Sequence, residues 1–430
     1  MTNLLKHMAR CWRMFVLIAI ATIPLVAAPL DQATGRSARV ALYASVGEEL
    51  IGYSVDLERA TLSRQSSLML PGFVQEAWAS PSKGFLYVAW SNGGTSYNGS
   101  GVAAQGDKHG VTTFRIDASG ALHVLGAAAP LRWRPIYITG DIPGSHLLVA
   151  YNDPSGVSVH TIKSDGTVGS EVAQPSDLEV GIYAHQVRVL PTNKSVILVT
   201  RGNQPTAATP EDAGALKVFR YNDGKLANWA SIAPSKGLGF RSRHLDFSPA
   251  GPWVFLTLES QNTLDVFKRM SDGTLSPEPL FSKSTLAGAG GVSPGQTASS
   301  VHLHPNGQFV YVGNRASGTT DFNGTPVFAG GSNNIAVFRI NQTTGEPSLI
   351  QNIDTRGFTP RTFAIDPSGR MLAVGNQTSM AVREGETVKT VPTNLAVFRI
   401  RADGMLDFVQ RYDMAAGRKP LWWMGLVPLR

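Results

Sequence analysis

Between residues 299 and 351, apolar and polar positions alternate in four short runs that are separated by Gly, Pro, Asn and Asp. The four runs are residues 299–304, 309–315, 334–340 and 347–351. β-Branched and aromatic residues are frequent in them, and such runs between turn-forming residues favour antiparallel strands. This stretch therefore predicts one sheet of four antiparallel strands joined as hairpins.

The four-strand unit recurs along the chain. Residues 362–377 repeat its first hairpin, and residues 394–400 repeat its third strand. The core of the second strand can be recognised seven times, at residues 40–43, 85–90, 147–151, 196–200, 253–258, 309–314 and 371–376. Repeats of roughly 40 to 60 residues with four strands each are typical of β-propellers. The sequence thus predicts an all-β fold, a seven-bladed β-propeller with four-stranded antiparallel blades.

The first blade lacks an innermost strand before residue 40, whereas the chain ends in an extra one. Residues 419–428 match the innermost strand at residues 359–367, yet no further strands follow them. Pairing this last strand into the first blade would remove an exposed sheet edge. We therefore expect the C-terminal strand to join the first blade and close the ring, so that residues 39–430 form one propeller.

Residues 1–28 have the composition of a secretory signal peptide. Three basic residues precede an apolar run at residues 14–25, which ends in small residues. A basic start, a short apolar core and a small-residue cleavage site are the features of such a signal. We expect a periplasmic or secreted protein in which residues 29–38 are a linker. Pro29 disfavours cleavage directly before it, so cleavage at a neighbouring residue and an uncleaved anchor remain alternatives.

Composition narrows the possible partners. The one cysteine, Cys11, lies within the predicted signal, so the mature chain has no disulfide. The formal charge of +7 falls to +4 when the three basic residues of the signal are removed, and no basic run remains. This pattern gives no support to nucleic-acid binding or to membrane contact beyond the signal. We expect a monomer that binds a small molecule and needs no cofactor or metal.

Charged residues recur at two fixed positions of the repeat. The turn prolines of four innermost hairpins serve as a ruler, at Pro191, Pro249, Pro305 and Pro367. Six residues before them come His185, Arg243, Ser299 and Arg361. Ten residues after them come Arg201, Glu259, Arg315 and Gln377. The two strands are antiparallel, so both sets lie at the end of the blade opposite the turn, and we expect them to surround one mouth of the central channel.

The remaining blades have less polar chemistry at these positions. The second blade has Gln75 and Ser91, and the closing strand has Trp422. One side of the channel mouth is therefore expected to carry most of the charge. Convergent polar groups in a concave site are the first place to look for function.

The sequence resembles the seven-bladed propeller lactonases, which include the 6-phosphogluconolactonase-like proteins and the fungal carboxymuconate cyclase. The resemblance is carried by residues 243–249, Glu259, residues 302–315 and residues 359–370, and it extends over nearly the whole mature chain. It implies a catalytic site of one histidine, two arginines and one glutamate. These are His185, Arg243, Glu259 and Arg315 in this chain.

Lactone opening needs a base that activates water and a positive group for the carbonyl oxyanion. Either His185 or Glu259 is the expected base, and the sequence does not separate them. Arg243 and Arg315 are expected to hold the oxyanion or a substrate carboxylate, because guanidinium groups are bidentate donors. The predicted substrate-binding residues are Arg201, Arg361, Gln377, Ser299 and His244.

We expect an exported lactonase for a sugar lactone. A phosphorylated gluconolactone is a cytosolic metabolite, so an unphosphorylated lactone is an equally good substrate for an exported chain. Four long loops, at residues 92–108, 203–214, 317–333 and 378–393, are expected to cover the mouth and to alter the ligand. The alternatives are a non-catalytic ligand-binding or scaffold propeller and a cyclic-carboxylate lyase or isomerase.

Overall fold

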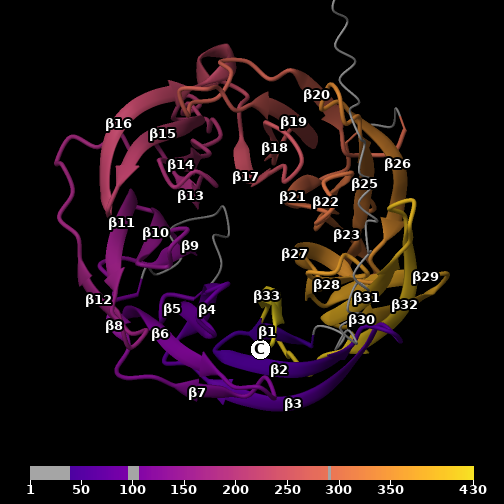
Figure 1. Ribbon diagram of the computed structural model, residues 1–430. Coiled ribbons are helices and arrows are strands. Elements are labelled where there is room, and N and C mark those ends of the chain that lie inside the picture. Colours follow the sequence, from indigo (N-terminus) through magenta and orange to yellow (C-terminus); the bar gives the residue numbers. More distant parts are fainter. Residues whose placement is uncertain (1–38, 95–105, 289–291) are drawn as a thin grey trace, which may run out of the picture. The chain divides into compact units, whose positions relative to one another are not determined.

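Seven β-sheets surround a central channel in the computed structural model (Figure 1). The structure describes residues 39–94, 106–288 and 292–430. The predicted signal and the predicted linker lie outside the described residues. One compact unit spans Ala38–Arg430. Among the described residues, no helix has the length and apolar character needed to cross a membrane.

Blades one, three and four each have four antiparallel strands, whereas blade two has a fifth, short strand. Blade one contains β33 (Leu421–Pro428), β1 (Val40–Val46), β2 (Glu49–Asp56) and β3 (Thr61–Met69). Blade two contains β4 (Phe73–Ala79), β5 (Phe85–Ser91), β6 (His109–Ile116), β7 (Leu122–Val124) and β8 (Ala129–Pro130). Blade three contains β9 (Pro135–Gly140), β10 (His146–Asn152), β11 (Ser155–Ile162) and β12 (Val168–Glu171). Blade four contains β13 (Ala184–Val189), β14 (Ser195–Thr200), β15 (Ala215–Asn222) and β16 (Lys225–Ile232).

The last three blades follow the same order from the channel outward. Blade five contains β17 (Ser242–Phe247), β18 (Trp253–Leu258), β19 (Thr263–Lys268) and β20 (Phe281–Ser284), and the 3-10 turn η1 (Pro234–Gly237) precedes it. Blade six contains β21 (Thr297–Leu303), β22 (Phe309–Arg315), β25 (Asn334–Ile340) and β26 (Pro347–Asp354). Blade seven contains β27 (Phe358–Ile365), β28 (Met371–Thr378), β31 (Asn394–Ile400) and β32 (Leu406–Asp413). The predicted seven-bladed propeller is confirmed.

The C-terminal strand closes the ring, as the sequence predicts. Strand β33 pairs antiparallel with β1, and Leu42 lies opposite Leu426 in this pairing. The hydroxyl of Ser45 accepts a hydrogen bond of 3.0 Å from the backbone N–H of Trp423. The two ends of the propeller are therefore joined within one sheet, and β33 covers the edge that β1 would otherwise expose to the channel.

The second strand of each blade forms the densest part of the core. Strands β1, β5 and β10 are buried along their whole length, because both of their faces pack against neighbouring blades. Tyrosines in three second strands also tie one blade to the next, since Tyr43, Tyr87 and Tyr311 donate hydrogen bonds of 2.7 to 2.8 Å to backbone carbonyls of glycine turns. A buried phenol normally finds such a partner. Apolar faces and repeated tyrosine contacts together hold the blades in a ring.

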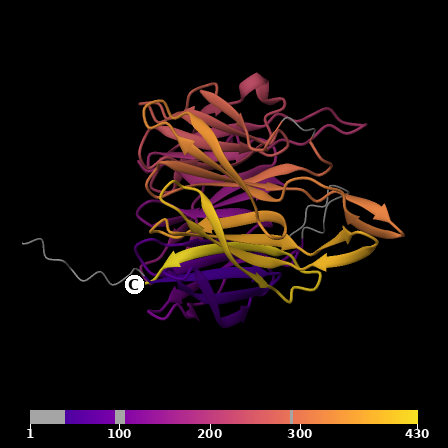
Figure 2. The same cartoon turned by 90° about the vertical axis from the view of Figure 1, so that its right-hand side faces the viewer.

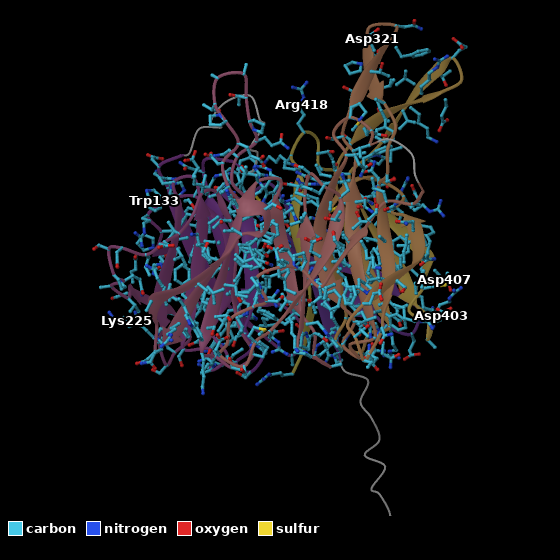
Figure 3. The ribbon with its side chains drawn as sticks, turned by 90° about the horizontal axis from the view of Figure 1, so that it is seen from above. Trp133, Lys225, Asp321, Asp403, Asp407 and Arg418 are labelled. Atoms are coloured by element: carbon cyan, nitrogen blue, oxygen red, sulfur yellow. The ribbon has the colours of Figure 1, made fainter. Side chains whose placement is uncertain are left out.

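Two of the four expected long loops contain regular β-hairpins, which the sequence analysis did not predict. Strands β23 (Thr319–Phe322) and β24 (Thr325–Phe328) form one hairpin, and β29 (Met380–Glu384) and β30 (Thr387–Val391) form the other. Asn323 and Gly324 have φ angles of 53° and 79°, which suit a two-residue hairpin turn. Both hairpins extend beyond the blades on one face of the propeller (Figures 2 and 3), with Asp321 at the tip of the first.

Candidate active site

Every innermost strand contains a β-bulge. In each blade this strand places two residues opposite one residue of its neighbour. Such a bulge changes the direction of side chains and is frequent beside active sites. The bulges contain Trp422, Gln75, Ile136, His185, Arg243, Ser299 and Arg361 in blades one to seven. The bulge therefore falls at the position that the turn-proline ruler selects.

A pocket of about 470 Å³ opens at this mouth. Six of the nine predicted site residues line it, namely His185, Arg201, Glu259, Arg315, Arg361 and Gln377. They come from blades four to seven, which the ruler predicts to carry most of the charge. This volume lies within the range of about 300–1,000 Å³ that is usual for small-molecule sites.

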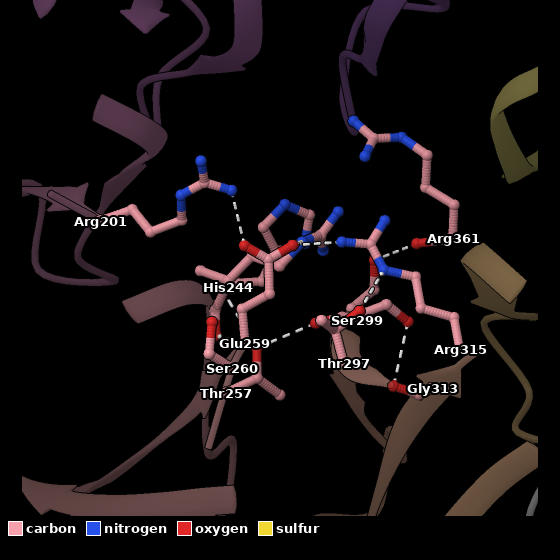
Figure 4. A network of polar contacts seen from close by, with 12 residues as sticks. Arg201, His244, Thr257, Glu259, Ser260, Thr297, Ser299, Gly313, Arg315 and Arg361 are labelled. Atoms are coloured by element: carbon pink, nitrogen blue, oxygen red, sulfur yellow. Dashed lines mark hydrogen bonds and ion pairs between the residues drawn. The ribbon is translucent and has the colours of Figure 1, made fainter. Parts of the chain in front are cut away.

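Three arginines hold the carboxylate of Glu259 (Figure 4). Arg201 donates a hydrogen bond of 2.7 Å to Oε2, and Arg315 donates one to Oε1. The Nε atom of Arg243 lies 3.4 Å from Oε1. Burial alone would raise the pKa of Glu259, but these three guanidinium groups outweigh it and hold the pKa of this carboxyl well below its ordinary value. Glu259 is therefore an ionised anchor at neutral pH.

Arg243 lies beneath the pocket rather than at its surface. Its side chain is 0% exposed, and its guanidinium group has no hydrogen-bond partner among the described residues. Burial and then Arg315 lower the pKa of Arg243 below its ordinary value. Its neighbour Arg241 instead directs its guanidinium group to the backbone carbonyl of Arg201 at 3.4 Å. Of these two arginines, only Arg243 forms an ion pair with Glu259.

His185 lines the pocket as a neutral imidazole. The residue is 5% exposed, and its Nδ1 has no hydrogen-bond partner among the described residues. Burial and then Arg243 and Arg201 lower the pKa of His185 well below its ordinary value. Its ring lies 5.1 Å from the ring of His244, which lies 5.6 Å from the ring of Tyr137. A neutral imidazole can accept a proton from water.

Ser299 and His244 do not line the pocket. The hydroxyl of Ser299 is buried, within hydrogen-bond distance of the backbone carbonyls of Gly313 (3.0 Å) and Pro360 (2.8 Å). These contacts join blade six to blade seven, which is a structural role. His244 is half-buried in the channel beside His185, so it can support that ring without lining the pocket.

Arg361 supplies a pocket cation that is outside the Glu259 network (Figure 4). Its guanidinium carbon lies 3.7 Å from the ring centre of Trp422, which also lines the pocket. Burial and the charge of Arg315 lower the pKa of Arg361 to about 9, although Glu76 acts in the opposite direction. The Arg361 cation remains the main form at neutral pH.

Several pocket residues were not predicted. They include Arg134, Asn152 and Tyr183, which extend the pocket to blades three and four. Arg134 precedes its innermost strand and so falls outside the ruler. Tyr183 has a φ of 57°, a left-handed backbone conformation that is uncommon for a bulky residue. A contact between residues that are so far apart in sequence leaves no local pattern by which it could be recognised.

Glu76 is a further unpredicted acid in the channel. It follows Gln75 on β4 and is half-buried. Burial raises the pKa of Glu76 to about 8, despite a hydrogen bond from the Ala77 N–H and the nearby charge of Arg361. Two carboxyl groups of the same channel, Glu76 and Glu259, thus have pKa values that are shifted in opposite directions.

Comparisons with known proteins agree with this architecture. The chain is 27% identical over 355 residues to a 6-phosphogluconolactonase of Erwinia tasmaniensis, covering 82% of this chain and 88% of that protein. It is 24% identical over 287 residues to a 6-phosphogluconolactonase of Bacillus subtilis, covering 62% of this chain and 70% of that protein.

Solved structures show the same fold. A protein from Lactobacillus plantarum matches with a TM-score of 0.65 and 21% identity, covering 91% of this chain and 100% of that chain. A periplasmic gluconolactonase of Pseudomonas aeruginosa matches with a TM-score of 0.62 and 21% identity, over 91% of this chain and 100% of that one.

The fold and the pocket define a seven-bladed propeller with a polar site at one channel mouth. Residues 41–386 match the family described as "Lactonase, 7-bladed beta-propeller". The chain therefore belongs to the seven-bladed propeller lactonase family, and its distant homologues include 6-phosphogluconolactonases.

Proposed function

We propose that this protein hydrolyses a sugar lactone in the pocket at the channel mouth. The observation that carries the proposal is that His185, Arg315 and Arg361 line one pocket together with the anchor Glu259. A neutral imidazole and cationic donors are the two groups that lactone opening requires. Membership of the lactonase family supports the same reaction class.

His185 is the general base in this proposal. Its neutral imidazole takes a proton from water, and the hydroxide so formed adds to the lactone carbonyl carbon. When the ring C–O bond breaks, the imidazolium returns the proton to the departing alkoxide, and the product is the open-chain acid. Glu259 is the poorer candidate, because both of its oxygens contact arginines, whereas Nδ1 of His185 has no hydrogen-bond partner among the described residues.

Arg315 and Arg361 stabilise the carbonyl oxyanion of the addition intermediate. Both line the pocket, and a guanidinium group offers charged N–H donors to an oxyanion. Arg243 and Arg201 position Glu259, and Glu259 in turn fixes Arg315. In this arrangement Arg243 acts through the carboxylate rather than on the substrate.

Rates of lactone opening test the proposal. Purified protein would be mixed with D-glucono-δ-lactone, D-galactono-γ-lactone and 6-phospho-D-glucono-δ-lactone, and acid release followed after subtraction of the uncatalysed rate. Catalysed opening of at least one lactone by the wild type, lost in a folded His185→Ala variant, is expected. Equal rates with and without the protein for the whole panel would contradict it and favour a scaffold or binding protein.

A cyclic-carboxylate lyase or isomerase is the second candidate. Among the described residues, four arginines and one glutamate line the pocket, and such an excess of positive charge suits a carboxylate substrate. The two reactions are distinguished by incubation with cis,cis-muconate and with muconolactone. Interconversion of these compounds without net uptake of water would favour the isomerase over the hydrolase.

We also propose that the protein is exported. The basic and apolar pattern of residues 1–28 supports this proposal, and a structurally similar gluconolactonase is described as periplasmic. Cell fractionation of a bacterium that expresses the full chain tests it. Recovery of a shortened chain outside the cytoplasm is the expected result, and full-length protein confined to the cytoplasm would contradict export.

A further inference from the structure

A buried arginine of blade three lines the same pocket from another side. Arg134 is 4% exposed, directly precedes β9 and contributes to the pocket wall. Its Nη2 donates a hydrogen bond of 3.3 Å to Oδ1 of Asn152, which also lines the pocket. Its Nη1 is buried and has no hydrogen-bond partner among the described residues. One edge of this guanidinium group is thus held while another donor is left unused.

A buried cation needs a compensating partner. Removing a guanidinium group from water is costly unless a charge or several hydrogen bonds replace the lost hydration. Arg134 forms no ion pair within 4.0 Å with a carboxylate of the described residues, although the charges of Tyr183 and Asp153 act on it. Such an orphaned donor in a ligand pocket is the feature of a site that is completed by an anion.

Arg134 faces the pocket from the side opposite the proposed oxyanion donors. Blade three lies across the ring from blades six and seven, which carry Arg315 and Arg361 (Figure 1). Arg201 and Arg315 are bound to Glu259, so Arg134 and Arg361 are the two pocket arginines without an ion pair to a described carboxylate. The pocket therefore has two separate cationic ends.

We propose that Arg134 and Asn152 form a second anion-binding subsite, which holds a phosphate or carboxylate substituent at the far end of the lactone. The substrate class rests on the proposed function, whereas the subsite itself concerns binding alone. A ligand with two polar ends would span the pocket, with its carbonyl at Arg315 and Arg361 and its anionic substituent at Arg134. Asn152 orients the guanidinium group through the 3.3 Å hydrogen bond.

Isothermal titration calorimetry of stable sugar acids tests the subsite without turnover. Gluconate has one anionic group, whereas 6-phosphogluconate and glucarate each carry a second one, a phosphate and a carboxylate respectively. We expect the wild type to bind at least one of the doubly charged acids more tightly than gluconate. Arg134→Gln should weaken that binding about 10- to 100-fold and change gluconate binding less than about 3-fold, as for loss of a charge-assisted bidentate contact.

Two further variants keep the test interpretable. Arg132→Gln removes the same charge two positions away, from a residue that pairs with Glu171 at the surface, and should leave both affinities unchanged. Asn152→Asp supplies a carboxylate beside Arg134 and should weaken the doubly charged acids while the arginine remains. Unfolding midpoints would establish that each variant is folded.

Several results would overturn the subsite. These are equal weakening of singly and doubly charged acids in Arg134→Gln, no weakening of either, or failure of the folded wild type to prefer either doubly charged acid. Failure of the proposed hydrolysis has a different signature. In that case the acids bind with the expected dependence on Arg134, yet no lactone is opened faster than in buffer.

Discussion

The two halves of the channel mouth share one backbone geometry but differ in chemistry. Blades four, five and seven place His185, Arg243 and Arg361 in the bulge of the innermost strand, whereas blades two and three place Gln75 and Ile136 there. The bulge recurs in every blade whatever side chain it contains, but the bulge residue lines the pocket only in blades one, three, four and seven, as Trp422, Ile136, His185 and Arg361. The fold supplies the position, and residue identity in a few blades supplies the function.

Two carboxyl groups extend the same contrast. Glu259 on the arginine-rich side has its pKa held low by three guanidinium groups, whereas burial raises the pKa of Glu76 to about 8. Burial raises the pKa of both groups, and the arginine partners of Glu259 reverse that effect for Glu259 alone. Near neutral pH, the charges on the arginine-rich side of the mouth, which blades four to seven form, stay constant, whereas Glu76 titrates in that pH range.

The largest expected effect is on catalysis by the arginine-rich side of the channel mouth. His185→Ala should lower kcat for lactone opening by about 10²–10⁴-fold, the usual contribution of a general base. Gln75→Ala, at the equivalent position of blade two, should change kcat less than about 3-fold. Initial rates of acid release measure both, and similar losses in the two variants would contradict the contrast between the halves.

The stability of the fold should depend strongly on Glu259. Glu259→Gln leaves three buried arginines without their carboxylate, so the free energy of unfolding should fall by about 3–5 kcal/mol. Glu171→Gln breaks an ion pair whose partners are both partly exposed, so its cost should stay below about 1 kcal/mol. Denaturant unfolding measures the two values, and equal costs would show that the arginine cluster does not depend on Glu259.

A smaller effect on the reaction is expected when a proposed oxyanion donor is removed. Arg361→Gln removes one of the proposed donors, and kcat/KM should fall by about 10²–10³-fold. The neutral side chain can still lie against Trp422, so the fold should be retained. A folded variant with the kcat/KM of the wild type would exclude Arg361 from the reaction.

The pH profile follows from the shifted pKa values. His185 must be neutral, and its pKa lies well below the ordinary value, so kcat/KM should stay level below pH 6.5 before it falls. Arg361 must be charged, and with a pKa of about 9 its loss of charge should lower kcat/KM above that pH. A profile that already falls between pH 7 and pH 6 would contradict a low pKa for the base.

The smallest effect links the two halves. The charge of Glu76 raises the pKa of Arg361, so Glu76→Gln should move the alkaline limb of the profile to lower pH. Glu58→Gln, which changes a surface carboxylate, serves as the control and should leave that limb in place. An unmoved limb in Glu76→Gln would show that the two groups do not interact.

Much of the fold could be predicted because each blade repeats a local pattern. The seven second strands, the turn prolines and the unmatched strand at residues 419–428 identify the ring and its closure without any tertiary information. The two hairpins of blades six and seven were missed, although Asn323 and Gly324 form a recognisable hairpin turn. Their polar composition was interpreted as loop, but alternating strands need not be apolar.

Only part of the pocket could be predicted. A ruler based on turn prolines finds residues that occupy equivalent positions, so it selects His185, Glu259, Arg315 and Arg361. It also selects Ser299, whose hydroxyl joins two blades instead of facing the pocket. Position within a repeat gives the end of the strand, but burial and hydrogen-bond partners depend on the neighbouring blades.

Arg134 shows the other kind of omission. It precedes its strand, and its partner Asn152 is the last residue of β10. The spacing of residues in the sequence does not relate these two positions to the site residues of blades six and seven, because they come together in the pocket only when the ring closes. The charge state of Glu76 is inaccessible for the same reason, since its pKa depends on burial by several blades.

A crystal structure with the released sugar acid bound tests the central claim most directly. The acid carboxylate should lie within hydrogen-bond distance of Arg315 or Arg361, with His185 beside it in the channel mouth. The account would be contradicted if the ordered acid were bound on another face of the propeller and absent from this pocket, because the arginine-rich side of the mouth would then not be the active site.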